Sequence, residues 1–212
     1  MGLFRPCLSV IVASMGRSAS TVLMRALLPA VAGPIIGLSP RLTRHMVQRW
    51  QTDLTTLTPR PGRVYKTHDR PVAGLPDYVR TIYTFADPFE VVASLHRQWH
   101  TAGEVWMREH ATNMVRREVD YVRMYDTDVL ELEANFDAWM QHDGPRCLLV
   151  RYDELWNQTE RLSAFLGRPV RLPPYQPRAS ALDQLDRDQR AAIERTYRGL
   201  RDKVLAVSIV ER

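Results

Sequence analysis

The sequence has few cysteines, no long hydrophobic run and no internal repeat. Its two cysteines, Cys7 and Cys147, lie in apolar, strand-like runs. This setting is typical of small buried side chains rather than of a disulfide framework. Every apolar run is shorter than the roughly 20 residues that a membrane-spanning helix needs, so we expect no membrane span. The brief apolar run near the N-terminus leads directly into a loop motif, and we expect a cytoplasmic location.

Positively charged residues are in modest excess over negatively charged ones. The chain has 29 Lys and Arg residues against 24 Asp and Glu residues, which gives a formal net charge of +5. The Arg residues are scattered rather than gathered in one tract, so we expect an anionic small ligand and no nucleic-acid partner. A length of 212 residues with 45% hydrophobic and 25% charged residues is ordinary for a globular chain. We expect a single domain over residues 1–212.

Residues 9–24 form the most informative stretch. A short run rich in β-branched residues is followed by small polar residues and then by apolar residues at helical spacing, which predicts a strand, a tight turn and a helix. The N–H groups of a helix's first turn and the helix dipole attract phosphate or sulfate. The loop lacks the closing Gly and the Lys-Ser/Thr of the nucleoside triphosphate loop, which disfavours a phosphotransferase. Its polar and small residues are Arg17, Ser18, Ala19, Ser20 and Thr21.

Residues 16–23 resemble the 5′-phosphosulfate loop of the sulfotransferases that use 3′-phosphoadenosine 5′-phosphosulfate (PAPS). The usual form of that loop is Pro-Lys/Arg-Ser-Gly-Thr-Thr-x-Leu. This chain departs from it at three positions, with Gly16 for Pro, Ala19 for Gly and Ser20 for Thr. The resemblance implies that Arg17 and residues 18–21 bind the 5′-phosphosulfate group.

A second motif ends the predicted strand over residues 63–68. Lys66 and His68 share one face of that strand because strand side chains alternate. Ligands lie beyond the carboxyl ends of parallel strands, so both side chains are expected beside the loop. Lys-Thr-His resembles the segment of cytosolic-type sulfotransferases that carries the catalytic base. The resemblance implies that His68 is the base, and that Lys66 and Arg17 stabilise negative charge.

A third motif follows the predicted strand over residues 79–85. Asp87 is expected to cap a helix that has Pro88 in its first turn. Residues 86–94 resemble the family's 3′-phosphate site, Arg-Asn/Asp-Pro-x-Asp-Val-x-x-Ser, and Ser94 keeps its place. Ala86, however, replaces the Arg that pairs with the 3′-phosphate. We expect weaker or altered nucleotide binding.

Three outcomes for the 3′-phosphate are open. Arg97 lies one helical turn beyond Ser94 and is our preferred replacement for the missing Arg. Arg178 in the Pro-rich segment over residues 168–180 is the second candidate, and loss of selectivity for the 3′-phosphate is the third. The family's late Arg/Lys-Gly segment has no match in this chain.

Residues outside these three motifs give further signals. His96 and His100 have the spacing of a metal-binding pair, but no acidic residue or Cys supports a metal site, and we expect none. Residues 152–155 and 165–167 resemble late structural segments of the same family. Trp99 and Trp106 are expected to pack or to line the acceptor site.

The remaining pattern predicts seven helices and one more strand. The helices are expected over residues 22–28 (ended by Pro29), 45–54, 89–100, 115–125, 130–140, the segment up to 167, and 182–204, and the strand over 146–152.

The motifs occur in the family's order from about Ser9 to Gly167. They imply an α/β fold of three layers, with a central parallel sheet flanked by helices, in the P-loop NTPase-like sulfotransferase architecture. They also imply PAPS as sulfuryl donor, no metal, and an acceptor hydroxyl or amine on a small molecule or a glycan. The alternative is a nucleotide- or glycan-binding relative that has lost catalysis, which Ala86 favours and the retained His68 disfavours.

Overall fold

The structure is a computed structural model that describes residues 8–32, 48–50, 53–144, 146–176 and 180–212. The strands are β1 (Ser9–Ser14), β2 (Gln48–Trp50), β3 (Val64–Thr67), β4 (Val79–Phe85), β5 (Cys147–Arg151) and β6 (Ile209–Glu211). The α-helices are α1 (Ser20–Ala32), α3 (Pro88–Val115), α4 (Leu132–Gln141), α5 (Thr159–Leu166) and α6 (Arg187–Leu205). Three short 3₁₀ helices are η2 (Tyr121–Tyr125), η3 (Tyr152–Glu154) and η4 (Leu182–Gln184).

The strands form one sheet in the order β2-β3-β1-β4-β5-β6. The first five strands in that order run parallel to one another, and β6 pairs antiparallel to β5 at the edge. The predicted central parallel sheet is confirmed, while the antiparallel edge strand was not predicted. β1 lies between β3 and β4, so the chain switches direction across the sheet at this strand. In such sheets the carboxyl ends of the strands beside the switch point are the usual ligand site.

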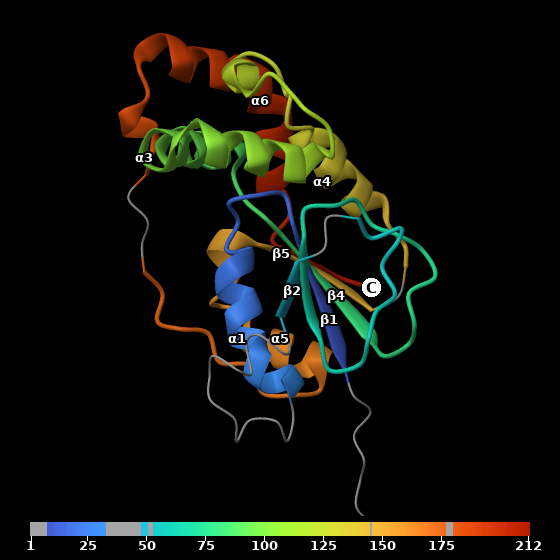
Figure 1. Cartoon of the computed structure of the whole chain (residues 1–212). Helices are drawn as coiled ribbons and strands as arrows, with labels where there is room; N and C mark the ends of the chain where they lie inside the picture. The colour runs from blue at the N-terminus through green and yellow to red at the C-terminus, as the bar shows by residue number, and fades with distance from the viewer. Residues whose placement is uncertain (1–7, 33–47, 51–52, 145, 177–179) are drawn as a thin grey trace, which may run out of the picture.

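Two hydrophobic cores place the sheet in the middle of three layers (Figure 1). Alternate residues of each strand face opposite sides, as the period of two requires. In β1, Val10 and Val12 pack with α1 and α5, whereas Ile11 and Ala13 pack with α3, α4 and α6. The three-layer α/β architecture is therefore confirmed.

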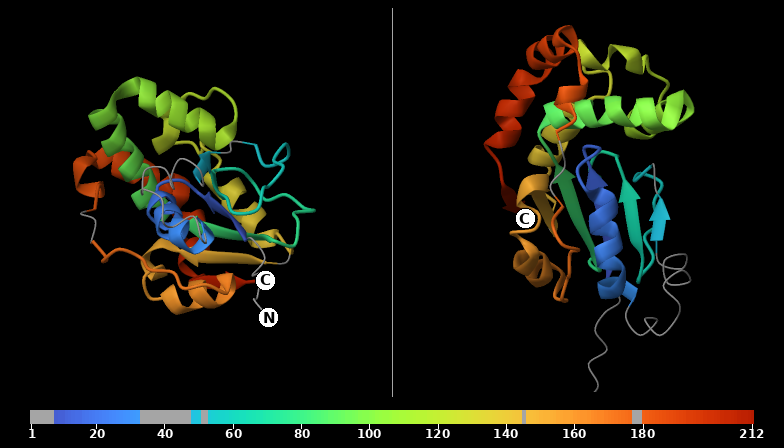
Figure 2. Two further views of the ribbon diagram at one scale, coloured as in Figure 1. Left: turned by 60° about the horizontal axis from the view of Figure 1, so that its bottom comes forward. Right: turned by 90° about the vertical axis from the view of Figure 1, so that its left-hand side faces the viewer.

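Helix α3 crosses over the ends at which β1 and its neighbours finish (Figure 2, right). Asp87 caps its start, and its side chain accepts a hydrogen bond from the N–H of Phe89, as predicted. Gly103 interrupts the helix with φ 85° and ψ 176°, a conformation that a side chain would disfavour. The kink turns residues 104–115 across the end of β1, which puts this half of α3 over the loop that follows β1.

Three predicted helix boundaries are wrong. Residues 48–50 of the predicted helix over 45–54 form β2, which pairs with β3 and thereby gains ladder hydrogen bonds; residues 45–47 lie outside the described residues. Pro29 does not end α1, which continues to Ala32. The predicted helix over 89–100 extends to Val115, because the kink at Gly103 redirects it without ending it.

Two later helices are also shorter than predicted. Residues 116–120 are not helical, and only η2 remains of the predicted helix over 115–125, since Arg116 adopts a left-handed conformation that caps α3. Of the predicted helix over 182–204, η4 is separate and α6 begins after Asp186. The side chain of Asp186 accepts from the N–H of Gln189, and the Gln189 side chain accepts from the N–H of Asp186. That reciprocal cap sets the start of α6.

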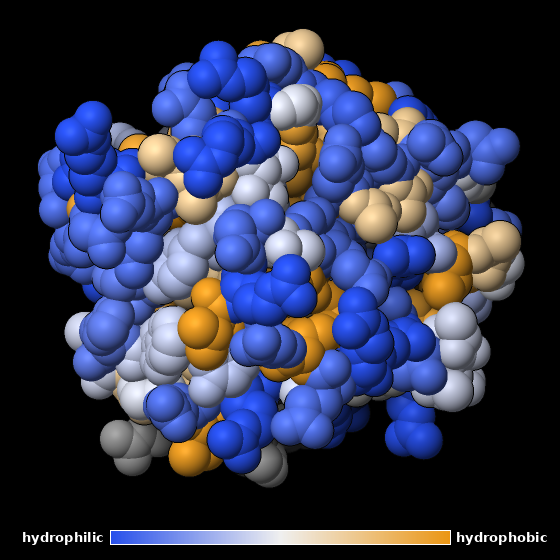
Figure 3. All heavy atoms as spheres, turned by 90° about the horizontal axis from the view of Figure 1, so that it is seen from above, coloured by the Kyte–Doolittle hydropathy of each residue, from blue (hydrophilic) through white to orange (hydrophobic). Residues whose placement is uncertain are grey.

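The surface over the helical layer is largely hydrophilic, with small hydrophobic groups between the polar side chains (Figure 3). No helix in the described part of the chain is long and apolar enough to cross a membrane. Cys147 is buried in β5 and forms no disulfide with a described residue, and burial raises the pKa of its thiol to about 12. The prediction that Cys147 acts as a small hydrophobic side chain is confirmed, while Cys7 lies outside the described residues.

Candidate functional site

The loop between β1 and α1 has an uncommon backbone conformation. Gly16, Arg17 and Ala19 all have positive φ, at 97°, 49° and 64°. Two of these are residues with a Cβ, for which this conformation is uncommon and costs energy. Ala19 stands where the resembled loop has Gly. Helix α1 begins directly afterwards at Ser20, so its N-terminal N–H groups and the positive end of its dipole lie at this loop.

Hydrogen bonds fasten the loop to the neighbouring strands. The hydroxyl of Ser18 donates to the carbonyl oxygen of Thr84 at 2.8 Å, and the ammonium of Lys66 donates to Thr21 Oγ1 at 2.7 Å. Both Ser18 and Lys66 are buried. Lys66 therefore lies at the first turn of α1, as the motif order predicts, and adds positive charge to the loop.

His68 lies beside the end of β1, because Thr67 is in register with Ala13. Its Nδ1 is 3.0 Å from the carbonyl oxygen of Ser14 and 2.9 Å from Ser14 Oγ. A carbonyl oxygen can only accept a hydrogen bond, so Nδ1 carries the ring proton and Nε2 carries the lone pair. Neutral His68 thus presents its basic nitrogen on the side of the ring away from Ser14.

The charges of the site change the protonation of these two side chains. Burial, and then the charge of Lys66, lower the pKa of His68 to about 4, although its hydrogen bond to Ser14 opposes the shift. Burial, and then the charges of Arg17 and Arg25, lower the pKa of Lys66 to about 8. His68 is therefore neutral, and Lys66 mostly charged, at pH 7.

Helix α4 fixes the backbone that carries His68. Asn135 Nδ2 donates to the carbonyl oxygen of His68 at 3.0 Å and Asn135 Oδ1 accepts from Tyr83 Oη at 2.9 Å. Trp139 Nε1 donates to the carbonyl oxygen of Asp69 at 3.1 Å. Asn135, Trp139 and Ser14 were not predicted as site residues, since an Asn within an amphipathic helix gives no signal of the strand end that it will meet.

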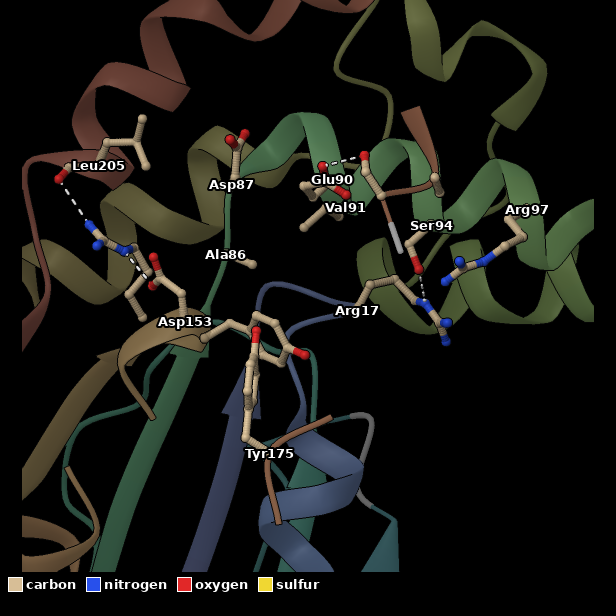
Figure 4. Close-up of a pocket in the computed structure, with 14 residues that line it drawn as sticks. Arg17, Ala86, Asp87, Glu90, Val91, Ser94, Arg97, Asp153, Tyr175 and Leu205 are labelled. Carbon is tan, nitrogen blue, oxygen red and sulfur yellow. Dashed lines mark hydrogen bonds and ion pairs between the residues drawn. The ribbon is translucent and has the colours of Figure 1, made fainter. Parts of the chain in front are cut away.

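The third motif also reaches the loop. Arg17 Nε donates to Ser94 Oγ at 3.0 Å, which joins the loop to the first half of α3 (Figure 4). A cavity of about 260 Å³ opens beside this pair. Figure 4 shows the side chain of Arg97 extending toward Arg17 and Ser94. The cavity is lined by Arg17, Ala86, Asp87, Glu90, Val91, Ser94, Arg97, Arg151, Tyr152, Asp153, Tyr175, Ser180, Ala181 and Leu205.

Two charged residues that line this cavity, Arg151 and Asp87, make contacts that hold neighbouring elements together. Arg151 donates to Asp153 and to the carbonyl oxygens of Leu205 and Val207. Asp87 caps α3 and accepts from Arg201 at 2.8 Å. Of the two candidates for replacing the missing Arg, Arg97 lines the cavity with Ala86, while Arg178 lies outside the described residues.

The second half of α3 covers the loop with one stripe of side chains. Trp106, His110 and Met114 follow one another at four-residue spacing and therefore share a face. The ring of Trp106 lies 5.9 Å from the Arg17 guanidinium, and the ring centroid of His110 lies 5.3 Å from that of His68. Met114 packs so closely that a Cβ on Gly16 would lie 2.9 Å from its Cε.

The two histidines with the spacing of a metal pair make protein contacts. The ring centroids of His96 and His100 are 4.4 Å apart, and His96 Nδ1 is hydrogen-bonded to Tyr125 Oη at 2.7 Å. Within the described ranges, no group of three or more His, Cys, Asp or Glu residues could hold a metal ion. The absence of a metal from the site stays a prediction.

Comparison with known proteins gives only distant likeness. No family model matches the chain, and no curated protein matches it. It is similar to retinol dehydratase solved with androsterone and the inactive cofactor PAP, with 16% identity, 90% of this chain and 68% of that chain covered, and a TM-score of 0.39. It is also similar to the sulfotransferase domain of the Synechococcus PCC 7002 olefin synthase, with 17% identity, 85% of this chain and 81% of that chain covered, and a TM-score of 0.40.

A third similar structure is the sulfotransferase domain from the curacin biosynthetic pathway. It has 16% identity and a TM-score of 0.39, with 84% of this chain and 82% of that chain covered. Likeness at this level identifies neither an activity nor a substrate.

Proposed function

We propose that this protein is a sulfotransferase that moves a sulfuryl group from PAPS to an acceptor hydroxyl or amine. The observation that carries the proposal is the convergence of Arg17, Lys66 and His68 on one loop at the carboxyl end of β1. The loop combines the N-terminal N–H groups of α1 with two cations, which suits a phosphosulfate group. His68 adds a neutral imidazole, which a site for binding alone does not need.

In the proposed reaction, the acceptor oxygen or nitrogen attacks the sulfur and forms a new bond to it. The bond from sulfur to the bridging oxygen of the donor's 5′-phosphate breaks, and its electrons stay on that oxygen. The acceptor's proton moves to Nε2 of His68, which has the lone pair. Arg17 and Lys66 stabilise the negative charge that develops on the bridging oxygen and on the sulfuryl oxygens.

The cavity beside Arg17 and Ser94 fits the nucleotide end of the same donor. It has a serine hydroxyl and Arg97 for a 3′-phosphate, and the rings of Tyr152 and Tyr175 for a base. We propose that Ser94 and Arg97 together replace the contact that Ala86 cannot make. Residues 18–21 hold the 5′-phosphate, with Ser18 fixed by Thr84 and Thr21 fixed by Lys66.

A transfer assay tests the proposal. Purified protein is incubated with PAPS labelled with ³⁵S and with phenol, catechol or glucosamine, and labelled product is counted. We expect turnover with at least one acceptor, and a fall in kcat on the order of 10²–10⁴ in His68→Asn. His100→Asn, on an exposed helix face, should match the wild type. Transfer that persists unchanged in His68→Asn removes His68 from the mechanism.

Ala86 supports a second candidate, a nucleotide-binding relative without catalysis. In that case the protein binds 3′-phosphoadenosine 5′-phosphate (PAP), the product nucleotide, but transfers no label to any of the three acceptors. The same assay, with PAP binding measured in parallel, separates the two functions.

A further inference from the structure

We propose that His110 is an acceptor-binding residue, and that the site prefers acceptors with two neighbouring hydroxyl groups. This inference rests on the proposed sulfuryl transfer and adds the class of acceptor to it. One hydroxyl would face His68 and react, while the adjacent hydroxyl would bind His110.

The first observation is a buried polar atom. Nε2 of His110 is buried and has no hydrogen-bond partner among the residues that the structure describes. A buried polar atom that lacks a partner destabilises the folded protein, so a native site rarely keeps one unless something binds there. A ligand that supplies a hydroxyl at this nitrogen would remove that cost.

The second observation is the position of this ring. It meets the ring of His68 edge to face, with centroids 5.3 Å apart and planes at 75°. His110 lies on α3 and His68 follows β3, so the two imidazoles approach the same region from different elements. Since the proposed acceptor oxygen must meet His68, a polar group so close to His68 lies next to the acceptor.

The third observation is how firmly the ring is held. The indole of Trp106 stacks on His110 with centroids 4.7 Å apart and planes at 12°. Met114, one turn further along α3, packs against Gly16. Burial, and then the nearby His68, Arg17 and Lys66, keep the pKa of His110 well below its ordinary value, so the ring stays neutral and can exchange a hydrogen bond with a hydroxyl.

The two rings are close enough to contact one small acceptor together. Each ring nitrogen reaches a hydroxyl at about 2.8 Å, and the two hydroxyls of a vicinal diol are themselves close to that distance apart. Because the two imidazoles are adjacent, with ring centroids 5.3 Å apart, we infer that each would bind one hydroxyl of the same diol. A monohydroxyl acceptor would leave Nε2 of His110 without a partner.

Catechol and phenol, which differ by one hydroxyl, test the inference with PAPS as donor. We expect kcat/KM for catechol to exceed that for phenol by about tenfold or more, the scale of one buried hydrogen bond. His110→Phe, which keeps a ring against Trp106 but has no nitrogen, should remove the preference through a higher KM for catechol. His110→Gln, which places an amide near Nε2, should restore part of it.

A readout without turnover completes the test. In PAP-loaded protein, the Cε1–H resonance of His110 should shift when catechol is added, and it should not shift with phenol. Equal kcat/KM for both phenols, an unchanged preference in His110→Phe, or no shift of this resonance with catechol overturns the inference while the transferase function stands. If PAP does not bind and no label is transferred, the proposed function itself has failed.

Discussion

The charge of Lys66 changes within the pH range of ordinary binding experiments. Its pKa is lowered to about 8 by burial and by Arg17 and Arg25, and a bound polyanion would raise this pKa again. In the proposed complex the charged form of Lys66 binds the nucleotide, so we expect full affinity below pH 8 and a fall in affinity as pH rises above it, by up to about tenfold per pH unit.

Titration of PAP between pH 7.5 and 9.5 measures this dependence. Lys66→Arg is the matched control, because an Arg side chain stays charged over the whole range. We expect the wild-type Kd to rise above pH 8 and the Kd of the variant to stay level. A parallel rise in both proteins would assign the dependence to another group.

Arg97 is the residue on which recognition of the 3′-phosphate depends in our account. It lines the same cavity as Ser94 and Ala86. Arg97→Ala should weaken PAP by about tenfold or more, since a charge-assisted hydrogen bond contributes about 1.5–3 kcal/mol. Binding of adenosine 5′-phosphate, which lacks the 3′-phosphate, should not change. The measurement is calorimetric titration with both nucleotides.

Arg108→Ala is the control for that experiment. Arg108 is exposed on the same helix, so the change removes an equal charge away from the cavity. Loss of affinity in both variants would indicate a general charge effect. No loss in Arg97→Ala would contradict the assignment and favour Arg178 or loss of selectivity.

Helix α3 determines whether the site is assembled, because its second half covers the loop. Gly103 has φ 85° and ψ 176° inside this helix, which a residue with a Cβ adopts only at a cost of about 1–3 kcal/mol. Gly103→Ala should therefore lower the free energy of unfolding by that amount, as measured by urea denaturation. It should also weaken PAP binding if the kink positions residues 104–115.

Gly199 is the matched control within α6. It is exposed in a helix interior and a Cβ there meets no atom within 4 Å, so Gly199→Ala should raise the free energy of unfolding by about 0.5–1 kcal/mol. Opposite signs in the two variants are the expected result. A stabilising Gly103→Ala would mean that the kink is absent in solution.

Elements near the motifs could be predicted, and elements defined by long-range contacts could not. The strands that begin at Ser9 and Val79 and the cap at Asp87 have local signals in β-branched runs and in Asp-Pro. β2 was predicted as helix, because three residues give no periodicity that distinguishes strand from helix. Only its pairing with β3 makes it a strand.

The residues of the site divide in the same way: local patterns predict the positions of some, and long-range contacts determine the positions of others. The placement of Lys66 and His68 beside the loop follows from strand alternation and from the ligand position in parallel sheets, and both are observed there. The approach of His110 to His68 depends on the kink at Gly103, because a continuous helix would carry residues 104–115 elsewhere. A single Gly in a helical pattern does not indicate such a turn.

At the scale of the whole molecule, our central proposal is that the sheet, the loop and the two halves of α3 form the binding site of a bisphosphorylated nucleotide. The net charge of +5 favours any anion, so it cannot by itself distinguish this nucleotide from others. Selectivity among adenine nucleotides is therefore the property that distinguishes a PAPS site from a general anion site.

The most direct measurement is calorimetric titration of the purified protein with PAP, with adenosine 5′-phosphate and with ATP plus magnesium. We predict that PAP binds at least about tenfold more tightly than the nucleotide without a 3′-phosphate, and more tightly than ATP. Failure to bind PAP, or a preference for ATP with magnesium, would contradict the assignment of this loop to PAPS.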